Sequence, residues 1–235
     1  MGRPVGGRVF IDLHCHTSAS FDSLADPVKV VRAAAARGLT HLLVTDHDVL
    51  GGAWRARDAA PDGLTVLVGQ EVRTTRGDLI AAFLDTPIPS GLAPADAIRA
   101  IRDRGGLVGI PHPFDRFRGS LLRDDDMRSL VPLVDWIEVH NARLFGRGNE
   151  LAAELAAEYD RPGVAASDAH TILEVGVAYT ALVGDPSTPA GLLAALPSAE
   201  VVTGRASVAV RLWTPVATAI QRVLGNGRTR PNVGA

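Results

Sequence analysis

The feature that most limits how this chain can fold is a repeating unit: a short apolar run, a polar or histidine-bearing end, and then a segment of helical character. Several runs are apolar throughout, as in strands that are buried on both faces of a parallel sheet. The predicted strands are RVFIDL at 8–13, HLLVT at 41–45, LTVLVG at 64–69, GLVGI at 106–110, VDWIEV at 134–139 and PGVAAS at 162–167. Alternating strands and helices predict an α/β fold with right-handed crossovers.

The segments between these runs carry helix start and stop signals. Asp26 is a candidate N-cap, Pro27 lies in the first turn, and Gly38 follows the end of the first such segment. The same reasoning predicts helices within 93–106, 148–160 and 188–196, and an extra strand at 78–85 that forms a hairpin with the third run.

At least six strand–helix units in a chain of 235 residues suit a small barrel better than an open dinucleotide-binding sheet. No GxGxxG follows the first run, which also disfavours the open sheet. We therefore expect residues 1–224 to form a single barrel domain and residues 225–235 to form a disordered tail.

Composition narrows the classes of function. Hydrophobic residues make up 46% of the chain, enough for a packed core, and the net charge of −2 provides no field for holding a long nucleic acid. The single cysteine, Cys15, excludes an intramolecular disulfide and a cysteine-cluster zinc site, and we expect it in the core. Without a secretion signal or a membrane-spanning run, the expected location is cytoplasmic, with no membrane contact.

Histidines and carboxylates gather where the predicted strands end. Six of the seven histidines lie within a few residues of a strand's C-terminal end: His14, His16, His47, His112, His140 and His170. The same ends carry Asp46, Asp48, Glu71, Glu138 and Asp168. In a barrel of parallel strands, the loops at this end build the active site. His41 opens its strand at the other end, and we expect it to be structural.

These residue types in this number indicate a site for several metal ions. His14 and His16 point to one side of an extended strand, and Cys15 points to the other. Histidine and carboxylate ligands suit Zn²⁺, Mn²⁺ or Fe²⁺ better than Ca²⁺. Since one ion takes three or four protein groups, the set predicts two or three divalent ions, with Glu71 as the candidate bridging carboxylate. Such a cluster activates water while it binds the oxygens of a phosphate ester.

The motifs DLHCHT, TDHD, GQE, PHPF, IEVHN and SDAH occur in this order and resemble the PHP (polymerase and histidinol phosphatase) family. The resemblance implies a distorted (β/α)7 TIM-like barrel with a trinuclear metal centre at the C-terminal ends of the strands. It implies that one ion is bound by His14, His16, Glu71 and Asp168, that Glu71 bridges to a second ion bound by His112, and that His47, His170 and Asp22 hold a third.

Two positions depart from the family pattern. The remaining ligand of the second ion comes from the region after IEV, where His140 is our candidate and Asn141 is the alternative. Asp78 lies where close relatives often carry histidine.

Further residues are expected to serve substrate binding or catalysis. Arg143 could bind a substrate phosphate in bidentate fashion, as could Arg116 and Arg118 in the loop PFDRFRG. We expect Asp46 to orient a ligand histidine and thereby to act with Glu71 and Asp168 in catalysis. Asp48 is a second candidate for the same orienting role.

The sequence thus predicts a metal-dependent phosphoesterase in which a metal-bound hydroxide attacks phosphorus at a di- or trinuclear centre. A small phosphomonoester such as a nucleotide, a nucleoside bisphosphate or a sugar phosphate is the expected substrate. An exonuclease that acts on the 3′ or 5′ end of a short oligonucleotide is one alternative, although an aromatic content of 5% leaves few side chains for stacking bases. A histidinol phosphatase and a non-catalytic, metal-stabilised binding or regulatory domain are the others. No feature of the sequence specifies an oligomeric state.

Overall fold

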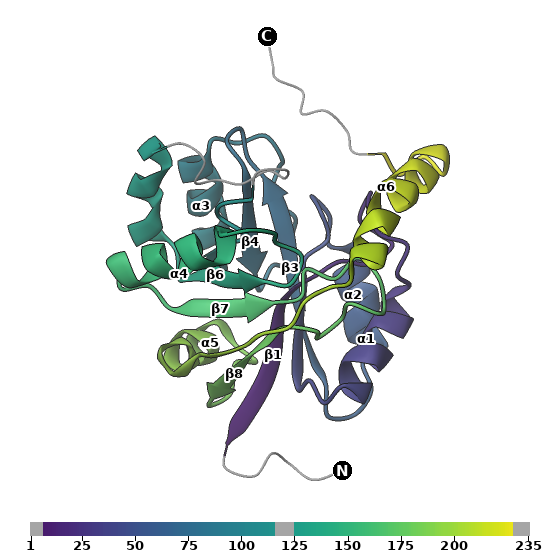
Figure 1. Cartoon of the computed structure of the whole chain (residues 1–235), viewed down its shortest axis with the longest axis horizontal. Coiled ribbons are helices and arrows are strands. Elements are labelled where there is room, and N and C mark those ends of the chain that lie inside the picture. The colour runs from purple at the N-terminus through teal and green to yellow at the C-terminus, as the bar shows by residue number, and fades with distance from the viewer. Residues whose placement is uncertain (1–6, 116–124, 228–235) are drawn as a thin grey trace.

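The computed structural model describes residues 7–115 and 125–227 and shows a mixed sheet that curls into a nearly closed barrel (Figure 1). Nine strands of the described residues form one sheet in the order β7-β6-β5-β4-β3-β2-β1-β8-β9. The strands are β1 Arg8–Cys15, β2 His41–Val44, β3 Thr65–Arg73, β4 Asp78–Ala82, β5 Leu107–Ile110, β6 Trp136–Asn141, β7 Gly163–Ala166, β8 Tyr179–Val183 and β9 Glu200–Val202. All six predicted apolar runs are strands, which confirms the α/β barrel class.

The barrel is distorted because antiparallel strands interrupt its parallel order. β1, β2 and β3 are parallel, and so are β5, β6 and β7. Between these two groups, β4 is antiparallel to both β3 and β5, as the hairpin prediction requires. On the other side, β8 pairs antiparallel with β1 and carries β9 beyond it.

The barrel closes through the loops that follow β1 and β7. The His16 amide donates to the Ala169 carbonyl at 2.8 Å, and the Asp168 amide donates to the His14 carbonyl at 2.9 Å. Lower in the barrel, the Thr180 hydroxyl on β8 bonds both backbone groups of Ala165 on β7 at 2.9 Å. The first two bonds join the loops after β1 and β7 at the end where the site lies, and the Thr180 bonds join β7 to β8.

The outside of the sheet is covered by helices α1 Pro27–Ala36, α2 Gly51–Asp58, α3 Pro94–Arg102, α4 Gly148–Glu158 and α5 Pro189–Ala195. Helix α6 Val208–Val223 lies apart from these (Figure 1), and the structure also describes the 3₁₀ segments η2 Asp125–Leu133 and η3 Leu196–Ser198. The Asp26 carboxylate caps α1 by accepting from the amides of Val28 and Lys29. α1, α3, α4 and α5 match the predicted helical segments, whereas α2 and α6 were not predicted.

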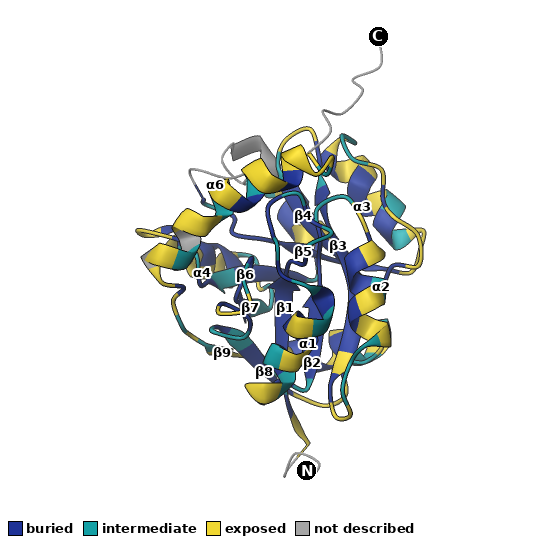
Figure 2. Cartoon of the chain, turned by 90° about the vertical axis from the view of Figure 1, so that its right-hand side faces the viewer, coloured by how far each residue is buried: buried dark blue, intermediate teal, exposed yellow. Residues whose placement is uncertain are grey.

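Apolar side chains fill two layers, one inside the barrel and one between the sheet and its helices. Figure 2 shows the buried strands at the centre and exposed residues on the outer sides of the helices. Cys15 is fully buried in the cluster that includes Val30 and Leu42, as a core residue should be. His41 lies at the start of β2, where its Nε2 is 3.1 Å from the Ser187 hydroxyl, in keeping with a structural role.

Within the predicted tail, residues 225–227 are described. The side-chain amide of Asn226 donates to the Ala19 carbonyl at 3.2 Å. Residues 228–235 lie outside the described residues. Among the helices that the structure describes, none combines the length and the apolar character needed to cross a lipid bilayer.

Candidate metal centre

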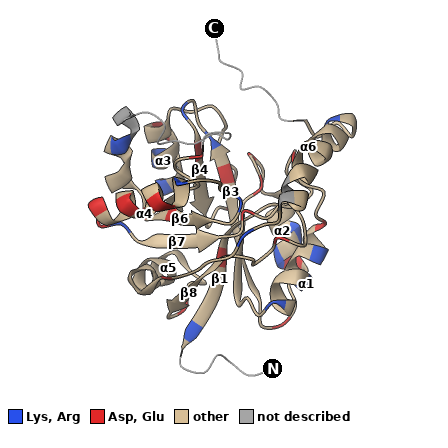
Figure 3. Cartoon of the chain, in the orientation of Figure 1, with Lys and Arg blue, Asp and Glu red and all other residues tan. Residues whose placement is uncertain are grey.

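Histidine and carboxylate side chains from β1, β3 and the loops after β1, β2, β5 and β7 converge at one end of the barrel. Eight of the nine predicted metal ligands belong to this set: His14, His16, Asp22, His47, Glu71, His112, Asp168 and His170. Most are almost completely buried. Figure 3 shows acidic residues inside strands β1 and β3, which is an expensive place for carboxylates unless cations or hydrogen-bond donors balance them.

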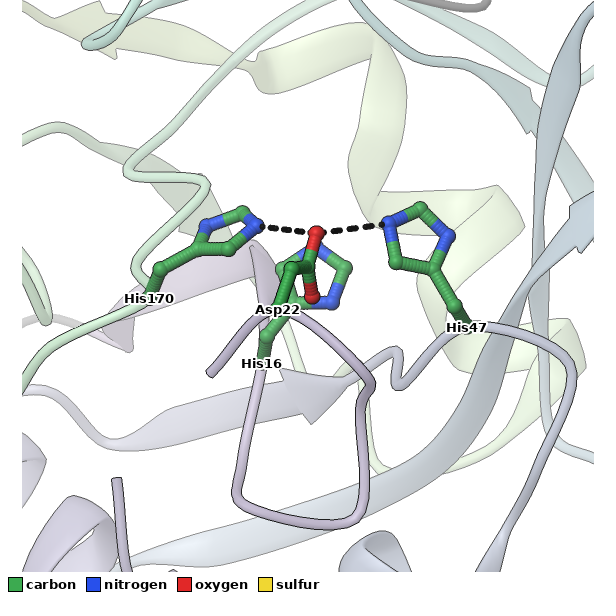
Figure 4. A group of neighbouring side chains, drawn as sticks. All are labelled: His16, Asp22, His47 and His170. Atoms are coloured by element: carbon green, nitrogen blue, oxygen red, sulfur yellow. Dashed lines mark hydrogen bonds and ion pairs between the residues drawn. The ribbon is translucent and has the colours of Figure 1, made fainter. Parts of the chain in front are cut away.

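One group surrounds Asp22 (Figure 4) and consists of His16, Asp22, His47 and His170, whose ligand atoms all lie within 4.8 Å of one another. The Asp22 Oδ2 atom is 3.0 Å from His170 Nε2 and 3.3 Å from His47 Nε2. The group therefore places one carboxylate oxygen between two imidazole nitrogens from different loops.

Two further groups share His14, and Glu71 links them to the group around Asp22. Glu71 Oε1 is 3.2 Å from His112 Nε2, while Glu71 Oε2 is 3.2 Å from His14 Nε2 and 3.4 Å from His47 Nε2. Asp168 Oδ1 completes the last group at 3.6 Å from His14 Nε2 and 3.5 Å from His16 Nε2. The two oxygens of Glu71 thus face histidines of different groups, which Glu71 joins to one another.

In at least two histidines, the ring nitrogen that points into the centre is the one that carries the lone pair when the ring is neutral. His14 Nδ1 faces Glu138 Oε1 at 3.0 Å, and His170 Nδ1 faces the Asp168 carbonyl at 2.8 Å. Each Nδ1 must donate a proton to such an acceptor, so the neutral ring turns an unprotonated Nε2 toward a carboxylate. Acceptors that face acceptors require a cation or an added proton between them, and the donor set therefore fits divalent metal ions.

The charges in the centre depend on one another. Burial raises the pKa of Glu71, but the neighbouring His47 and His14 outweigh it and bring that pKa well below its usual value. Burial likewise raises the pKa of Asp22, and His170 and His47 outweigh it in the same way. Both carboxylates are therefore ionised, and ions that bind here would displace protons from the histidines.

Backbone strain is found at two of these positions. His112 has a φ of 27° and Asp168 a φ of 52°, values that are unusual for residues other than glycine. Strained residues cluster at functional sites, where the surrounding structure holds them in place.

His140 does not join the centre, in contrast to the sequence-based expectation. Its Nε2 is 2.8 Å from the Gly204 carbonyl. The reason is a β-bulge: the register of β6 on β7 shifts by one residue between Glu138 and His140. The bulge breaks the alternation, so that Asn141, and not His140, lies with Glu138 on the side of the centre.

Glu138 and Asn141 support the ligands from outside the convergent groups. Glu138 Oε2 accepts from the His112 amide at 2.7 Å and from Asn141 Nδ2 at 2.8 Å. Asn141 Nδ2 also lies 3.0 Å from Asp168 Oδ2. The sequence indicated Glu138 as a carboxylate at a strand end, but its contact with His14 could not be inferred from a single strand.

Asp78 belongs to a further possible ligand group with His47 and Glu71. It is buried at the start of β4. Close relatives often carry histidine at this position, and Asp78 offers an oxygen ligand there instead.

Asp46 orients the loop after β1 and does not contact a histidine ring. Its Oδ1 accepts from the Thr17 amide at 2.6 Å, and its Oδ2 accepts from the Thr17 hydroxyl at 2.7 Å. Thr17 follows His16, so Asp46 acts on that ligand through the backbone. Asp48 accepts from the Arg73 amide at 3.0 Å and has a φ of 60°.

The arginine candidates for phosphate binding have different outcomes. The Arg143 side chain is 8% exposed and forms an ion pair with Glu174 at 2.9 Å, while a second guanidinium nitrogen donates to the Thr214 hydroxyl at 2.6 Å. Its guanidinium is thus occupied by protein partners. Arg116 and Arg118 lie outside the described residues.

Comparison with known families gives two matches. Residues 12–173 match the family described as PHP domain, and residues 146–201 match the family described as PHP-associated. The first match covers more than half of the chain and includes every convergent ligand named above.

Among curated relatives, an uncharacterized protein of Methanocaldococcus jannaschii is 32% identical over 56% of this chain and 81% of its own length. A 5′-3′ exoribonuclease of Haemophilus influenzae is 31% identical over 52% of this chain and 50% of its own length. A 3′,5′-nucleoside bisphosphate phosphatase of Chromobacterium violaceum is 38% identical over 40% of this chain and 33% of its own length.

Solved structures share the fold. A two-domain protein of Bacteroides vulgatus containing a predicted PHP-like metal-dependent phosphoesterase aligns with a TM-score of 0.71 at 19% identity, over 84% of this chain and 65% of that one. A lesion-specific endonuclease of Pyrococcus furiosus aligns with a TM-score of 0.63 at 17% identity, over 83% of this chain and 57% of that one.

Proposed function

Because the chain belongs to the PHP domain family and is a metal-dependent phosphoesterase of that family, we propose that it hydrolyses a small phosphomonoester. The observation that carries the proposal is the convergence of four overlapping ligand groups, in which His14, His16, His47 and Glu71 each belong to two groups. A shared bridging carboxylate is the arrangement that holds neighbouring ions about 3.5–4 Å apart.

The ligand assignment that we propose follows the groups in the structure. His14, His16 and Asp168 with Glu71 would hold one ion, and Glu71 with His112 would hold a second. Asp22, His47 and His170 with His16 would hold a third. Divalent ions bound there would lower the pKa of a water molecule and stabilise the negative charge of a phosphoryl group. Zn²⁺, Mn²⁺ and Fe²⁺ suit these nitrogen and oxygen donors.

The surrounding residues position the ligands for this reaction. Glu138 accepts from Nδ1 of His14, so that the lone pair of the neutral ring lies on Nε2, which faces the centre. The side-chain amide of Asn141 donates to Asp168 Oδ2 and so positions that carboxylate. The ring of Phe21 packs against that of His47, with ring centroids 4.9 Å apart.

A small substrate is supported by charge and by one relative. The net charge of −2 disfavours a long polyanion, and Arg143 is already paired with Glu174, so within the described residues we assign phosphate binding to the metal centre, which suits a substrate with one or two phosphates. The matching segment of the 3′,5′-nucleoside bisphosphate phosphatase also favours a nucleotide-like monoester.

A nuclease acting on a strand end is the second candidate. The matching exoribonuclease and the fold shared with a lesion-specific endonuclease favour it. The same centre would serve a phosphodiester as readily as a monoester, so the choice between them depends on the loops around the site.

The test measures phosphate release from nucleotides, nucleoside bisphosphates, sugar phosphates and short oligonucleotides with Mn²⁺, Zn²⁺ or Fe²⁺. The chain is compared with Asp168→Ala, which removes a proposed ligand, and with Asp185→Ala, whose exposed carboxylate lies by His41 at the opposite end of the barrel. We expect release from one small class, abolished in Asp168→Ala and retained in Asp185→Ala. Nucleotide release from oligonucleotides alone would instead establish the nuclease, and equal activity of both variants would exclude this centre as the site.

A further inference from the structure

The C-terminal helix α6 contacts the loop that carries Asp22 although it lies outside both family matches, which together end at residue 201. Figure 1 shows this helix in yellow, apart from the helices that surround the barrel. Its inward side carries Thr214, Ala217 and Gln221, which are spaced three and four residues apart and therefore share one helix face. Two of these three side chains are polar: Gln221 bonds to the loop that carries Asp22, and Thr214 bonds to Arg143.

Gln221 binds the loop that carries Asp22. Its buried side-chain amide, Nε2, donates to the carbonyls of Ser18 at 2.9 Å, Ser20 at 3.2 Å and Ser23 at 2.6 Å. An amide nitrogen has two protons, so the three carbonyls occupy both of them and at least one proton is shared between two carbonyls. The loop between β1 and α1 is thereby attached to α6 at three points on either side of Asp22.

Ser20, one of the three residues whose carbonyls Gln221 binds, is itself in contact with two proposed ligands. The Ser20 hydroxyl donates to Asp22 Oδ1 at 2.8 Å and accepts from the His47 amide at 3.3 Å. A shift of the Ser20 backbone would therefore displace two members of the group around Asp22.

Thr214 reaches the same group from the other side. Its hydroxyl accepts from Arg143, which pairs with Glu174 at 2.9 Å. Glu174 in turn accepts from the His170 amide at 3.1 Å. This chain of contacts connects α6 to the loop after β7, on which His170 lies.

Burial of large apolar residues does not explain how α6 is oriented. Leu212 is 69% exposed and Val223 is 86% exposed, and Figure 2 colours most of the helix as exposed. A helix held mainly by hydrophobic burial would turn these side chains inward. The polar contacts of Thr214 and Gln221 instead set which side of α6 faces the barrel.

We propose that α6 is part of the metal centre and that Gln221 and Thr214 are positioning residues, which fix the loops of Asp22 and His170 so that this group can hold its ion. The inference rests on the proposed metal centre, and it concerns only the ion of the group around Asp22. Among the bonds of the described residues, Gln221 reaches the other groups only through Ser20, whose hydroxyl is 3.4 Å from Nδ1 of the shared His16, so we expect the largest effect on the ion of the group around Asp22.

The test measures metal content by mass spectrometry, and the dissociation constant of each ion by chelator competition, on the full chain. Gln221→Met keeps the length of the side chain but removes its donors, and Val223→Met places the same side chain at an exposed position of the same helix. We expect Gln221→Met to raise the dissociation constant of one ion by about 10- to 100-fold. Val223→Met should bind metal as the wild type does.

A double variant separates positioning from general damage. Asp22→Ala removes the ligand itself, so adding Gln221→Met to it should cause no further loss of metal if Gln221 acts through this group. Further loss from the other groups would overturn the proposal. Thr214→Val, which is nearly isosteric, provides a milder variant should Gln221→Met fold poorly, and it should weaken the same ion.

Wild-type dissociation constants for every ion in both Gln221→Met and Thr214→Val would also overturn the proposal. The outcome is distinct from that of the proposed function, because metal content is measured without a substrate. A chain that binds its ions but releases no phosphate would reject the phosphomonoester proposal and leave the role of α6 in place.

Discussion

Glu138 Oε1 lies 3.0 Å from His14 Nδ1, so a carboxylate on β6 determines which nitrogen of a histidine on β1 carries the proton. The same carboxylate accepts from the His112 amide and from Asn141 with its other oxygen. One buried side chain thus orients a histidine from β1 and the loop after β5. Carboxylates in this position raise the basicity of a ligand histidine and hold its ring.

The first prediction follows from this contact. In Glu138→Gln, an NH₂ group would replace one of the two oxygens. Depending on the orientation of the amide, it would face either the His112 and Asn141 donors or the Nδ1 proton of His14. We expect metal affinity to fall by about 10- to 100-fold, as is usual when such a supporting carboxylate is lost. Calorimetric titration with Mn²⁺ measures the change, and Glu158→Gln on the exposed side of α4 is the matched control. An affinity equal to that of the control would mean that Glu138 does not orient His14.

A second prediction concerns two adjacent glycines at the start of α2. A Cβ atom at Gly52 would lie 1.9 Å from Asp46 Oδ2 and 2.1 Å from Thr17 Oγ1, whereas a Cβ atom at Gly51 would meet nothing within 4 Å. Gly52→Ala must therefore break the Asp46–Thr17 contact, and we expect it to lower the free energy of unfolding by about 1–3 kcal/mol.

Gly51→Ala is the matched control, and we expect it to unfold at the same or slightly higher urea concentration, because alanine favours helices. Urea denaturation of the two variants measures the difference. Metal affinity should also fall in Gly52→Ala alone, since Thr17 follows His16. Equal stability and equal metal affinity of the two variants would contradict the prediction. It would mean that Asp46 and Thr17 can move away from the new methyl group without cost.

Much of the fold could be predicted because the strands are short and uniformly apolar. RVFIDL and HLLVT are typical of strands buried on both faces, and Asp26 with Pro27 predicts the start of α1. α2 was missed because it begins with Gly51 and Gly52 and has no side-chain cap. α6 was missed because Pro215 lies inside it, where proline usually interrupts a helix.

The predicted ligands come together because they lie at the same ends of parallel strands, which is a property of topology and not of any one residue. His140 is different, since its orientation depends on the bulge in β6. A bulge leaves no distinct signal in a run such as IEVHN, and strict alternation then places the wrong side chain toward the centre. The support from Glu138 and Gln221 depends on contacts between distant segments and could not be inferred from spacing.

A third prediction uses His41, which lies far from the metal centre. Burial lowers the pKa of His41 below its ordinary value of 6.5, although the Asp185 carboxylate acts in the opposite direction. The unfolded chain therefore binds this proton at a higher pH than the folded chain does. The free energy of unfolding should consequently fall as the pH drops below 6.5 toward the lowered pKa.

His41→Gln cannot titrate, so the stability that wild type has over this variant should be constant above about pH 7.5 and should shrink below about pH 6.5. Urea unfolding of both proteins across this range measures the difference. Taking the difference cancels the titration of the metal centre, which both proteins share. A difference that is the same at every pH would show that His41 has similar pKa values in the folded and unfolded chains.

The last prediction is that metal ions stabilise the fold. Asp22 and Glu71 are ionised and buried beside histidines that can give up a proton to bind a metal, so an ion that binds the folded chain adds stability according to its concentration. At a free concentration 100 times the dissociation constant, one ion contributes about 2.7 kcal/mol. We expect treatment with EDTA to lower the melting temperature and graded addition of Mn²⁺ to restore it. Asp22→Asn should show a smaller restoration than wild type, because it weakens one ligand group. Melting temperatures that do not respond to EDTA or Mn²⁺ would contradict a metal centre built from these residues.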